Sequence, residues 1–182
     1  KFLPDDLEIR LDANGAFCKN NALEKLERLG NFSIHSIEQP IMPNQQQEMA
    51  KLCELSPIPI ALDEELIGVN LSQEREKLLD TINPHFLIVK PSLLGGFKDS
   101  NEWIHFAEKR NIKWWATSAL ESNVGLNSIA QWVSTKNNEL RQGLGTGMLF
   151  SNNIQSPLCI EKDAIFLKEH KKWDLNFFTK QA

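Results

Sequence analysis

Short apolar runs alternate with segments of helical spacing along most of the 182-residue chain. The runs are rich in β-branched and aromatic residues and are bounded by polar residues, Gly or Pro, which is typical of β-strands. Between them, apolar residues recur every three or four positions, which predicts amphipathic helices. The expected strands are 7–11, 33–37, 58–62, 86–89 and 112–116, and the expected helices are 22–29, 47–55, 71–82, 101–109 and 126–133.

This alternation predicts an α/β fold in which parallel strands are joined by crossover helices, either an open doubly wound sheet or a (β/α)8 TIM-type barrel. An open sheet would be favoured by a Gly-rich phosphate loop after the first strand, and residues 12–17 do not form one. The barrel is therefore favoured, and the tail from residue 151 to 182, where the alternation stops, is expected to wrap or close one end.

Charge and composition exclude several classes of partner. The chain has 20 basic and 24 acidic residues and a net charge of -4, without a basic stripe that would bind nucleic acid. No apolar stretch approaches the ~18 residues that a membrane helix needs, and the first residues do not resemble a secretory signal. Three widely spaced cysteines fit neither a disulfide framework nor a thiolate metal site. We expect a cytoplasmic protein.

Four charged residues follow successive predicted strands at almost equal intervals. Asp12, Glu38, Asp63 and Lys90 are separated by 26, 25 and 27 residues, each about one βα unit. Taken singly, an Asp in this place is usually a helix cap and a Lys a solvated residue. Because the carboxyl ends of barrel strands converge on one face, the repeated spacing favours a shared functional site.

The chemistry of this set predicts a metal centre. Three carboxylates that meet at one point repel one another unless a cation neutralises them. Oxygen ligands of this kind select a hard divalent ion, Mg²⁺ before Mn²⁺. Lys90 would supply a cation or a proton-transfer group on the other side of a bound carboxylate substrate.

The segments around these residues resemble the four motifs of the muconate-lactonizing subgroup of the enolase superfamily. They are 12–14 (DAN), 37–40 (IEQP), 62–64 (LDE) and 89–91 (VKP), and the resemblance extends from about Leu7 to Phe150. It implies that Asp12, Glu38 and Asp63 bind Mg²⁺ and that Lys90 is catalytic. Asn14 and Glu64, within the same motifs, are expected to support the ligands.

The resemblance also suggests a reaction. Residues 117–126 and 143–146 resemble strand ends of o-succinylbenzoate synthases, with Thr117, Ser118 and Gly143 as substrate-binding residues. That family dehydrates 2-succinyl-6-hydroxy-2,4-cyclohexadiene-1-carboxylate in menaquinone biosynthesis. The alternatives are an N-succinylamino acid racemase, a dipeptide epimerase, or a catalytically silent barrel that binds a small acid.

Two features bear on these alternatives. Dipeptide epimerases of the subgroup carry an Asp-x-Asp motif at the last strand, and residues 142–160 contain no acidic residue. Ser118 and Glu121 have the spacing of a capping box for the next helix, which is as plausible as a role in substrate binding.

The chain is expected to be the C-terminal part of a barrel, with strands 3 to 8 and a tail over residues 1–182. Its strand ends give about six βα units, against the eight of a closed barrel. The Lys-x-Lys motif of the subgroup, which supplies the principal base, belongs one unit before Asp12. We therefore expect this chain alone to be inactive, with the preceding part of the enzyme as its partner and with a possible homo-oligomer.

Overall fold

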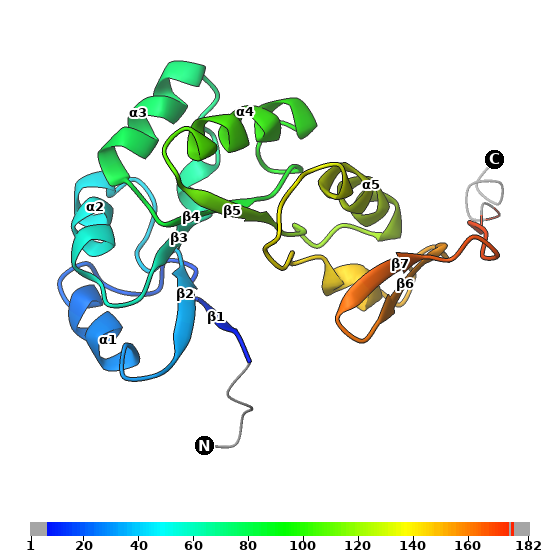
Figure 1. Ribbon diagram of the computed structural model, residues 1–182, viewed down its shortest axis with the longest axis horizontal. Helices are drawn as coiled ribbons and strands as arrows, with labels where there is room; N and C mark the ends of the chain where they lie inside the picture. The colour runs from blue at the N-terminus through cyan, green and yellow to red at the C-terminus, as the bar shows by residue number, and fades with distance from the viewer. Residues whose placement is uncertain (1–6, 175, 177–182) are drawn as a thin grey trace. The chain divides into compact units, whose positions relative to one another are not determined.

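Five strands form one sheet whose order follows the sequence. A computed structural model describes residues 7–174 and 176. The sheet has the order β1-β2-β3-β4-β5, and the pairs β1·β2, β2·β3 and β3·β4 are parallel (Figure 1). The strands are β1 (Ile9–Asp12), β2 (Ile34–Glu38), β3 (Ile60–Leu62), β4 (Phe86–Val89) and β5 (Lys113–Ala116). All five expected strands are thus confirmed.

The five expected helices are also present, with two 3-10 turns. They are α1 (Ala22–Leu29), α2 (Gln46–Leu55), α3 (Ser72–Ile82), α4 (Phe97–Glu108) and α5 (Asn123–Ser134), with η1 (Glu64–Leu66) and η2 (Gly145–Met148). The largest error is in α4, which begins four residues earlier than expected. Its first turn is mostly polar, so the apolar periodicity starts only near Trp103.

Two compact units make up the chain. The first contains the chain up to Val89 and Leu94–Trp114, and the second contains Lys90–Leu93 and the chain from Trp115 onward. In the first unit, α1 to α4 lie on one side of the strands (Figure 1). A sequential strand order with helices on one side is the arrangement of a barrel wall, whereas a doubly wound sheet reverses its order and carries helices on both faces.

The core of the first unit lies between the strands and these helices. Each helix contributes a large side chain that is at most 1% exposed, namely Leu26, Met49, Leu79 and Trp103. The strands face them with β-branched and aliphatic residues, and all four residues of β4 are buried. Burying apolar side chains from both layers is what fixes the helices on the sheet.

In the second unit, α5 packs on a short antiparallel hairpin. The hairpin consists of β6 (Leu158–Glu161) and β7 (Ala164–Leu167), and Ile165 packs against the buried Leu126, Ile129 and Leu144. The sixth expected strand end is reduced to an isolated parallel bridge between Thr117 and Gly143. The loss of the strand and helix alternation after residue 150 is confirmed.

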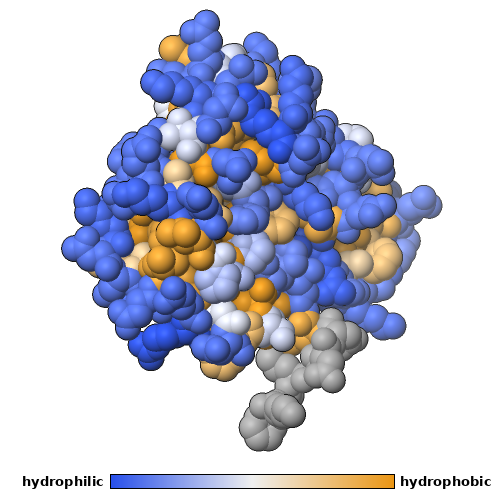
Figure 2. Space-filling model, turned by 60° about the vertical axis from the view of Figure 1, so that its left-hand side comes forward, coloured by the Kyte–Doolittle hydropathy of each residue, from blue (hydrophilic) through white to orange (hydrophobic). Residues whose placement is uncertain are grey.

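In the part of the chain that the structure describes, no helix combines the length and hydropathy of a membrane span. Figure 2 shows a mainly hydrophilic face with separate apolar patches. All three cysteines are free, and burial raises the pKa of Cys53 to about 12. Since the thiolate is the reactive form, Cys53 is a core residue and no nucleophile.

Candidate active site

The predicted metal ligands occupy neighbouring strand ends in the first unit. Asp12 and Glu38 are register partners in the pair β1·β2, and Glu38 is the partner of Ala61 in β2·β3. Asp63 stands two residues beyond Ala61, and because side chains alternate along a strand it belongs to the same face. The sheet therefore aligns the three positions at its carboxyl edge, as the equal spacing predicts.

The side chains of the three predicted ligands differ in environment and do not converge on one point. Asp12 is exposed, Glu38 is half-buried, and Asp63 is 3% exposed. The backbone N–H of Asn14, which is in the left-handed region at φ 44°, donates to Asp12 Oδ1 at 2.9 Å. Within residues 7–174 and 176, no three His, Cys, Asp or Glu side chains are placed so that they could hold one metal ion. The donor set has the chemistry of a Mg²⁺ site, and the ligand role stays a prediction.

A buried glutamine within the motif at 37–40, for which the sequence predicted no role, connects two of these strand ends. Gln39 follows Glu38 directly and is 0% exposed. Its Oε1 accepts hydrogen bonds from the backbone N–H groups of Asp63 at 3.2 Å and of Glu65 at 3.3 Å. A polar residue between a strand and a Pro was the available signal, but its partners lie more than 20 residues away.

Glu65, beside the predicted residue Glu64, is also buried, at 5% exposed. Its Oε1 accepts from the backbone N–H of Asn44 at 3.1 Å, and its Oε2 accepts from Gln39 Nε2 at 3.4 Å. Burial raises the pKa of Glu65, and these hydrogen bonds oppose the shift. Glu64 itself is half-buried and opens the 3-10 turn η1.

Lys90 follows β4 directly and is half-buried. Its carbonyl accepts a hydrogen bond from the backbone N–H of Leu93 at 2.9 Å, which starts a tight turn at this strand end. Next to it, Ser92 Oγ donates to the carboxylate of Glu121. Within the second unit, the loops that follow β4 and β5 are therefore held together by Glu121.

The predicted substrate-binding residues are brought together in the second unit. Thr117 and Gly143 form a parallel bridge, and the backbone N–H of Ser118 donates to the carbonyl of Gly143 at 3.0 Å. Ser118 Oγ is hydrogen-bonded to Thr146 Oγ1. Thr117 Oγ1 is buried and makes no hydrogen bond to the described residues. The hydroxyl groups of Thr117 and Ser118 have the chemistry to bind an anionic substrate group, whereas the N–H groups of Ser118 and Gly143 already donate to backbone carbonyls.

The capping-box interpretation of Ser118 and Glu121 is wrong. The residue that precedes α5 is Ser122, whose side chain makes no capping hydrogen bond, and the N–H of Asn123 donates to Asn153 Oδ1 at 2.9 Å. Instead Glu121 accepts a hydrogen bond from the backbone N–H of Ala119 at 2.8 Å, and Ser118 Oγ accepts from that of Leu120 at 3.3 Å. The helix begins two residues after Glu121, so both side chains stabilise the preceding loop.

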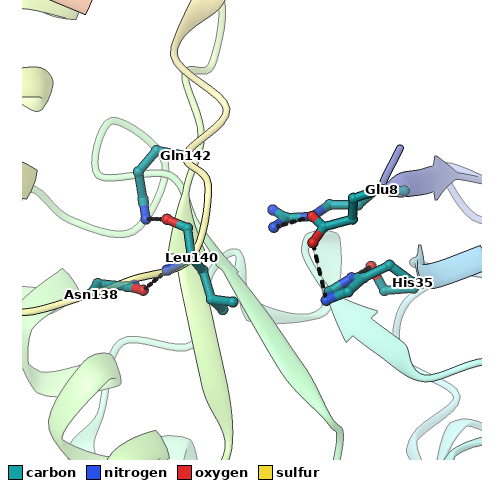
Figure 3. Close-up of polar contacts among 7 residues, drawn as sticks. Glu8, His35, Asn138, Leu140 and Gln142 are labelled. Atoms are coloured by element: carbon teal, nitrogen blue, oxygen red, sulfur yellow. Dashed lines mark hydrogen bonds and ion pairs between the residues drawn. The ribbon is translucent and has the colours of Figure 1, made fainter. Parts of the chain in front are cut away.

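Gln142 fixes the segment that leads to Gly143. Its side-chain Nε2 donates to the carbonyl of Leu140, and the Leu140 N–H donates to Asn138 Oδ1 at 2.9 Å (Figure 3). Its Oε1 accepts from the backbone N–H of Ala116, the last residue of β5, at 2.7 Å. Local patterns do not indicate this contact, because its partner is 26 residues away.

A second charged group lies at the opposite end of β1 and β2. Glu8 contacts Arg10 at 2.7 Å and His35 Nε2 at 3.9 Å (Figure 3). Burial lowers the pKa of His35, Glu8 opposes this shift, and Arg10 and Lys113 add to it. His35 stands near the start of β2, whereas Glu38 ends it, so this histidine is not placed to act with the carboxylates.

Gly143 is expected to tolerate no side chain unless Thr117 becomes smaller. A Cβ at residue 143 would lie 2.6 Å from Thr117 Cγ2. Gly143→Ala should therefore lower the free energy of unfolding by about 1–3 kcal/mol, the usual cost of overpacking. Thr117→Ser removes that methyl group, so the double variant should recover most of the loss in urea denaturation. Equal losses in the single and double variants would show that the methyl contact is not the cause.

Comparison with known proteins agrees with this arrangement. Residues 1–165 match the family described as Enolase C-terminal domain-like. The chain belongs to this family. The match covers the sheet, its helices and the strand ends that carry the predicted ligands, so membership in the family confirms the resemblance that the four motifs indicated.

Among relatives in this family, the chain is 54% identical over 160 residues to o-succinylbenzoate synthase from Desulfotalea psychrophila, covering 88% of the chain and 43% of that protein. It is 34% identical over 114 residues to N-succinylamino acid racemase from Thermus thermophilus, covering 63% and 30%. The crystal structure of MenC from Desulfotalea psychrophila superposes with a TM-score of 0.87 at 52% identity, covering 90% and 46%. The chain thus spans less than half the length of these relatives.

Proposed function

We propose that the protein containing this chain dehydrates 2-succinyl-6-hydroxy-2,4-cyclohexadiene-1-carboxylate to o-succinylbenzoate. The observation that carries this proposal is the 54% identity to an o-succinylbenzoate synthase over nearly the whole chain. The alignment of Asp12, Glu38 and Asp63 at adjacent strand ends supports it, because a site for a carboxylate substrate needs a cation at such a place.

The predicted metal ligands, Lys90 and the predicted substrate-binding residues each have a proposed role in this reaction. Asp12, Glu38 and Asp63 would hold Mg²⁺, after rotation about their side-chain torsions. When bound, the ion supplies stabilisation of the negative charge that develops on the substrate carboxylate. Lys90 would stabilise the same charge with its ammonium group or move a proton at the α-carbon. Thr117 and Ser118 would bind the succinyl carboxylate through their hydroxyl groups, and Gly143, which has no side chain, would let the substrate approach the backbone closely.

The substrate must be inferred within a family of related reactions. A dipeptide substrate carries a free ammonium group, which needs a carboxylate partner, and residues 142–160 offer none. An N-succinylated amino acid has no free ammonium group and shares the succinyl carboxylate. N-succinylamino acid racemase is therefore the second candidate, and the 34% identity to such an enzyme supports it.

Catalysis is proposed for the intact protein and not for these residues alone. The 182 residues contain no Lys-x-Lys sequence, which supplies the principal base in the subgroup that the motifs resemble. The chain also spans 43% of the related synthase. We propose that the remainder of the barrel is its essential partner and that the isolated 182 residues do not turn over.

Substrate profiling of the intact protein tests the proposal. We expect the protein to remove water from the cyclohexadiene acid, and the absorbance of the aromatic product measures this reaction. The rate of the reaction should depend on Mg²⁺. Exchange of the α-hydrogen of N-succinylamino acids in deuterated water, without any dehydration, would assign the racemase instead. Absence of both reactions, together with no Mg²⁺ binding, would indicate a catalytically silent barrel.

A further inference from the structure

We propose that Gln39 is a positioning residue that joins the carboxyl ends of β2 and β3 and holds the backbone of Glu38 and Asp63 in place for the divalent cation. The inference rests on the proposed function, since it assigns a role toward that metal site. Gln39 acts through the backbone that carries the two ligands and not through contact with substrate or metal.

All hydrogen-bonding groups of the Gln39 amide are used inside the first unit. Oε1 accepts from the N–H groups of Asp63 and Glu65, at 3.2 and 3.3 Å. Nε2 donates to the carbonyl of Ile41 at 3.0 Å and to Glu65 Oε2 at 3.4 Å. One buried side chain thus ties the turn after β3 to the loop after β2.

Gln39 contacts the backbone of both strands that carry predicted ligands, β2 with Glu38 and β3 followed by Asp63. On β2, Gln39 is bonded covalently to Glu38, and its own backbone N–H donates to the carbonyl of Ala61 in β3 at 2.9 Å. On β3, its amide fixes the N–H of Asp63, which is itself 3% exposed. Movement of the backbone at Glu38 would therefore strain the hydrogen bonds that hold the backbone at Asp63, and the reverse is also true.

The local backbone also indicates a functional constraint. Gln39 has φ 37°, in the left-handed region that residues with a Cβ rarely adopt. Such conformations persist where the surroundings over-determine them, and they cluster at functional sites. Here the four amide contacts and a fully buried position over-determine the conformation.

Mn²⁺ affinity of the intact protein without substrate tests this role. Gln39→Leu keeps the approximate volume and removes all four amide contacts. We expect it to weaken Mn²⁺ binding, followed by electron paramagnetic resonance, about 10- to 100-fold, the usual effect of losing a partner behind a metal ligand. Gln47→Leu, on the exposed side of α2, makes the same replacement and should leave the affinity within about twofold of wild type.

A second variant keeps the test decisive if Gln39→Leu does not fold. Glu65→Gln keeps an oxygen that accepts from the N–H of Asn44, but it places the new side-chain NH2 against Gln39 Nε2, which is also a donor. This variant should weaken Mn²⁺ binding by a smaller factor, up to about 10-fold. Thermal unfolding in the presence of a chelator identifies the temperatures at which each variant is folded, and the Mn²⁺ affinities are measured at those temperatures. Folded variants with wild-type Mn²⁺ affinity would overturn the positioning role alone. Failure of the wild-type protein to bind Mn²⁺ would overturn the proposed function and this inference together.

Discussion

Replacing Arg75 by alanine is expected to lower the free energy of unfolding by about 3 kcal/mol, the low end of the cost of breaking a buried ion pair. The Arg75 side chain on α3 is 1% exposed. Its guanidinium donates to Asp99 Oδ2 at 2.9 Å, to the carboxylate of Glu102, and to the carbonyl of Val69 at 3.0 Å. It therefore connects α3 with α4 and with the loop before α3.

The size of this effect follows from the partners. Asp99 and Glu102 are 31% and 35% exposed, so water would solvate their carboxylates once Arg75 is removed. The carbonyl of Val69 would lose its side-chain donor. The guanidinium also lies 5.6 Å from the centre of the Trp103 ring, so its removal leaves a cavity beside a fully buried side chain. Desolvation and packing thus add to the lost ion pairs.

Arg110 provides the matched control in urea denaturation. It forms a two-point ion pair with Asp80 at 2.7 and 3.1 Å, but Asp80 is 62% exposed. Solvent screens such a pair, so Arg110→Ala should cost much less than Arg75→Ala. Equal losses for both variants would contradict the importance of burial at Arg75.

Replacing Asp63 by asparagine is expected to reduce turnover of the intact protein by more than about 1,000-fold. The change removes one charge from the predicted metal site and keeps the shape of a side chain that is 3% exposed. Loss of an outer partner of a metal ligand costs about 10- to 100-fold, and loss of a ligand removes the charge stabilisation itself.

Asp80→Asn makes the same chemical replacement at an exposed position on α3 and should leave turnover unchanged. Glu38→Gln, from the neighbouring strand, should behave like Asp63→Asn. Substantial turnover by Asp63→Asn with unchanged dependence on Mg²⁺ would show that Asp63 is not a ligand.

Local patterns in the sequence predicted the strands and helices of the βα units, but not the hairpin of β6 and β7. The expected strands and helices are all present because periodicity of apolar residues reports which face each segment buries. Boundaries failed at the starts of α4 and α5, where the residues after Phe97 are polar and where Asn123 and Gly125 interrupt the apolar periodicity. The capping-box interpretation failed because Glu121 bonds to a loop N–H before the helix, a choice that spacing alone does not decide.

The candidate site was predicted in part. Equal spacing placed Asp12, Glu38 and Asp63 at adjacent strand ends, since each βα unit returns the chain to the same edge. Gln39 and Gln142 were missed because their amides bond to backbone groups 24 to 26 residues away. Such contacts depend on the register between strands, which periodicity does not report.

A crystal structure of the intact protein with Mg²⁺ measures directly whether three acidic side chains from consecutive strands share one ion. We expect a single Mg²⁺ with one oxygen each from Asp12, Glu38 and Asp63 at about 2.0–2.1 Å, the usual Mg²⁺–oxygen distance. An ion bound elsewhere, or with fewer than two of these carboxylates, would contradict the proposed site.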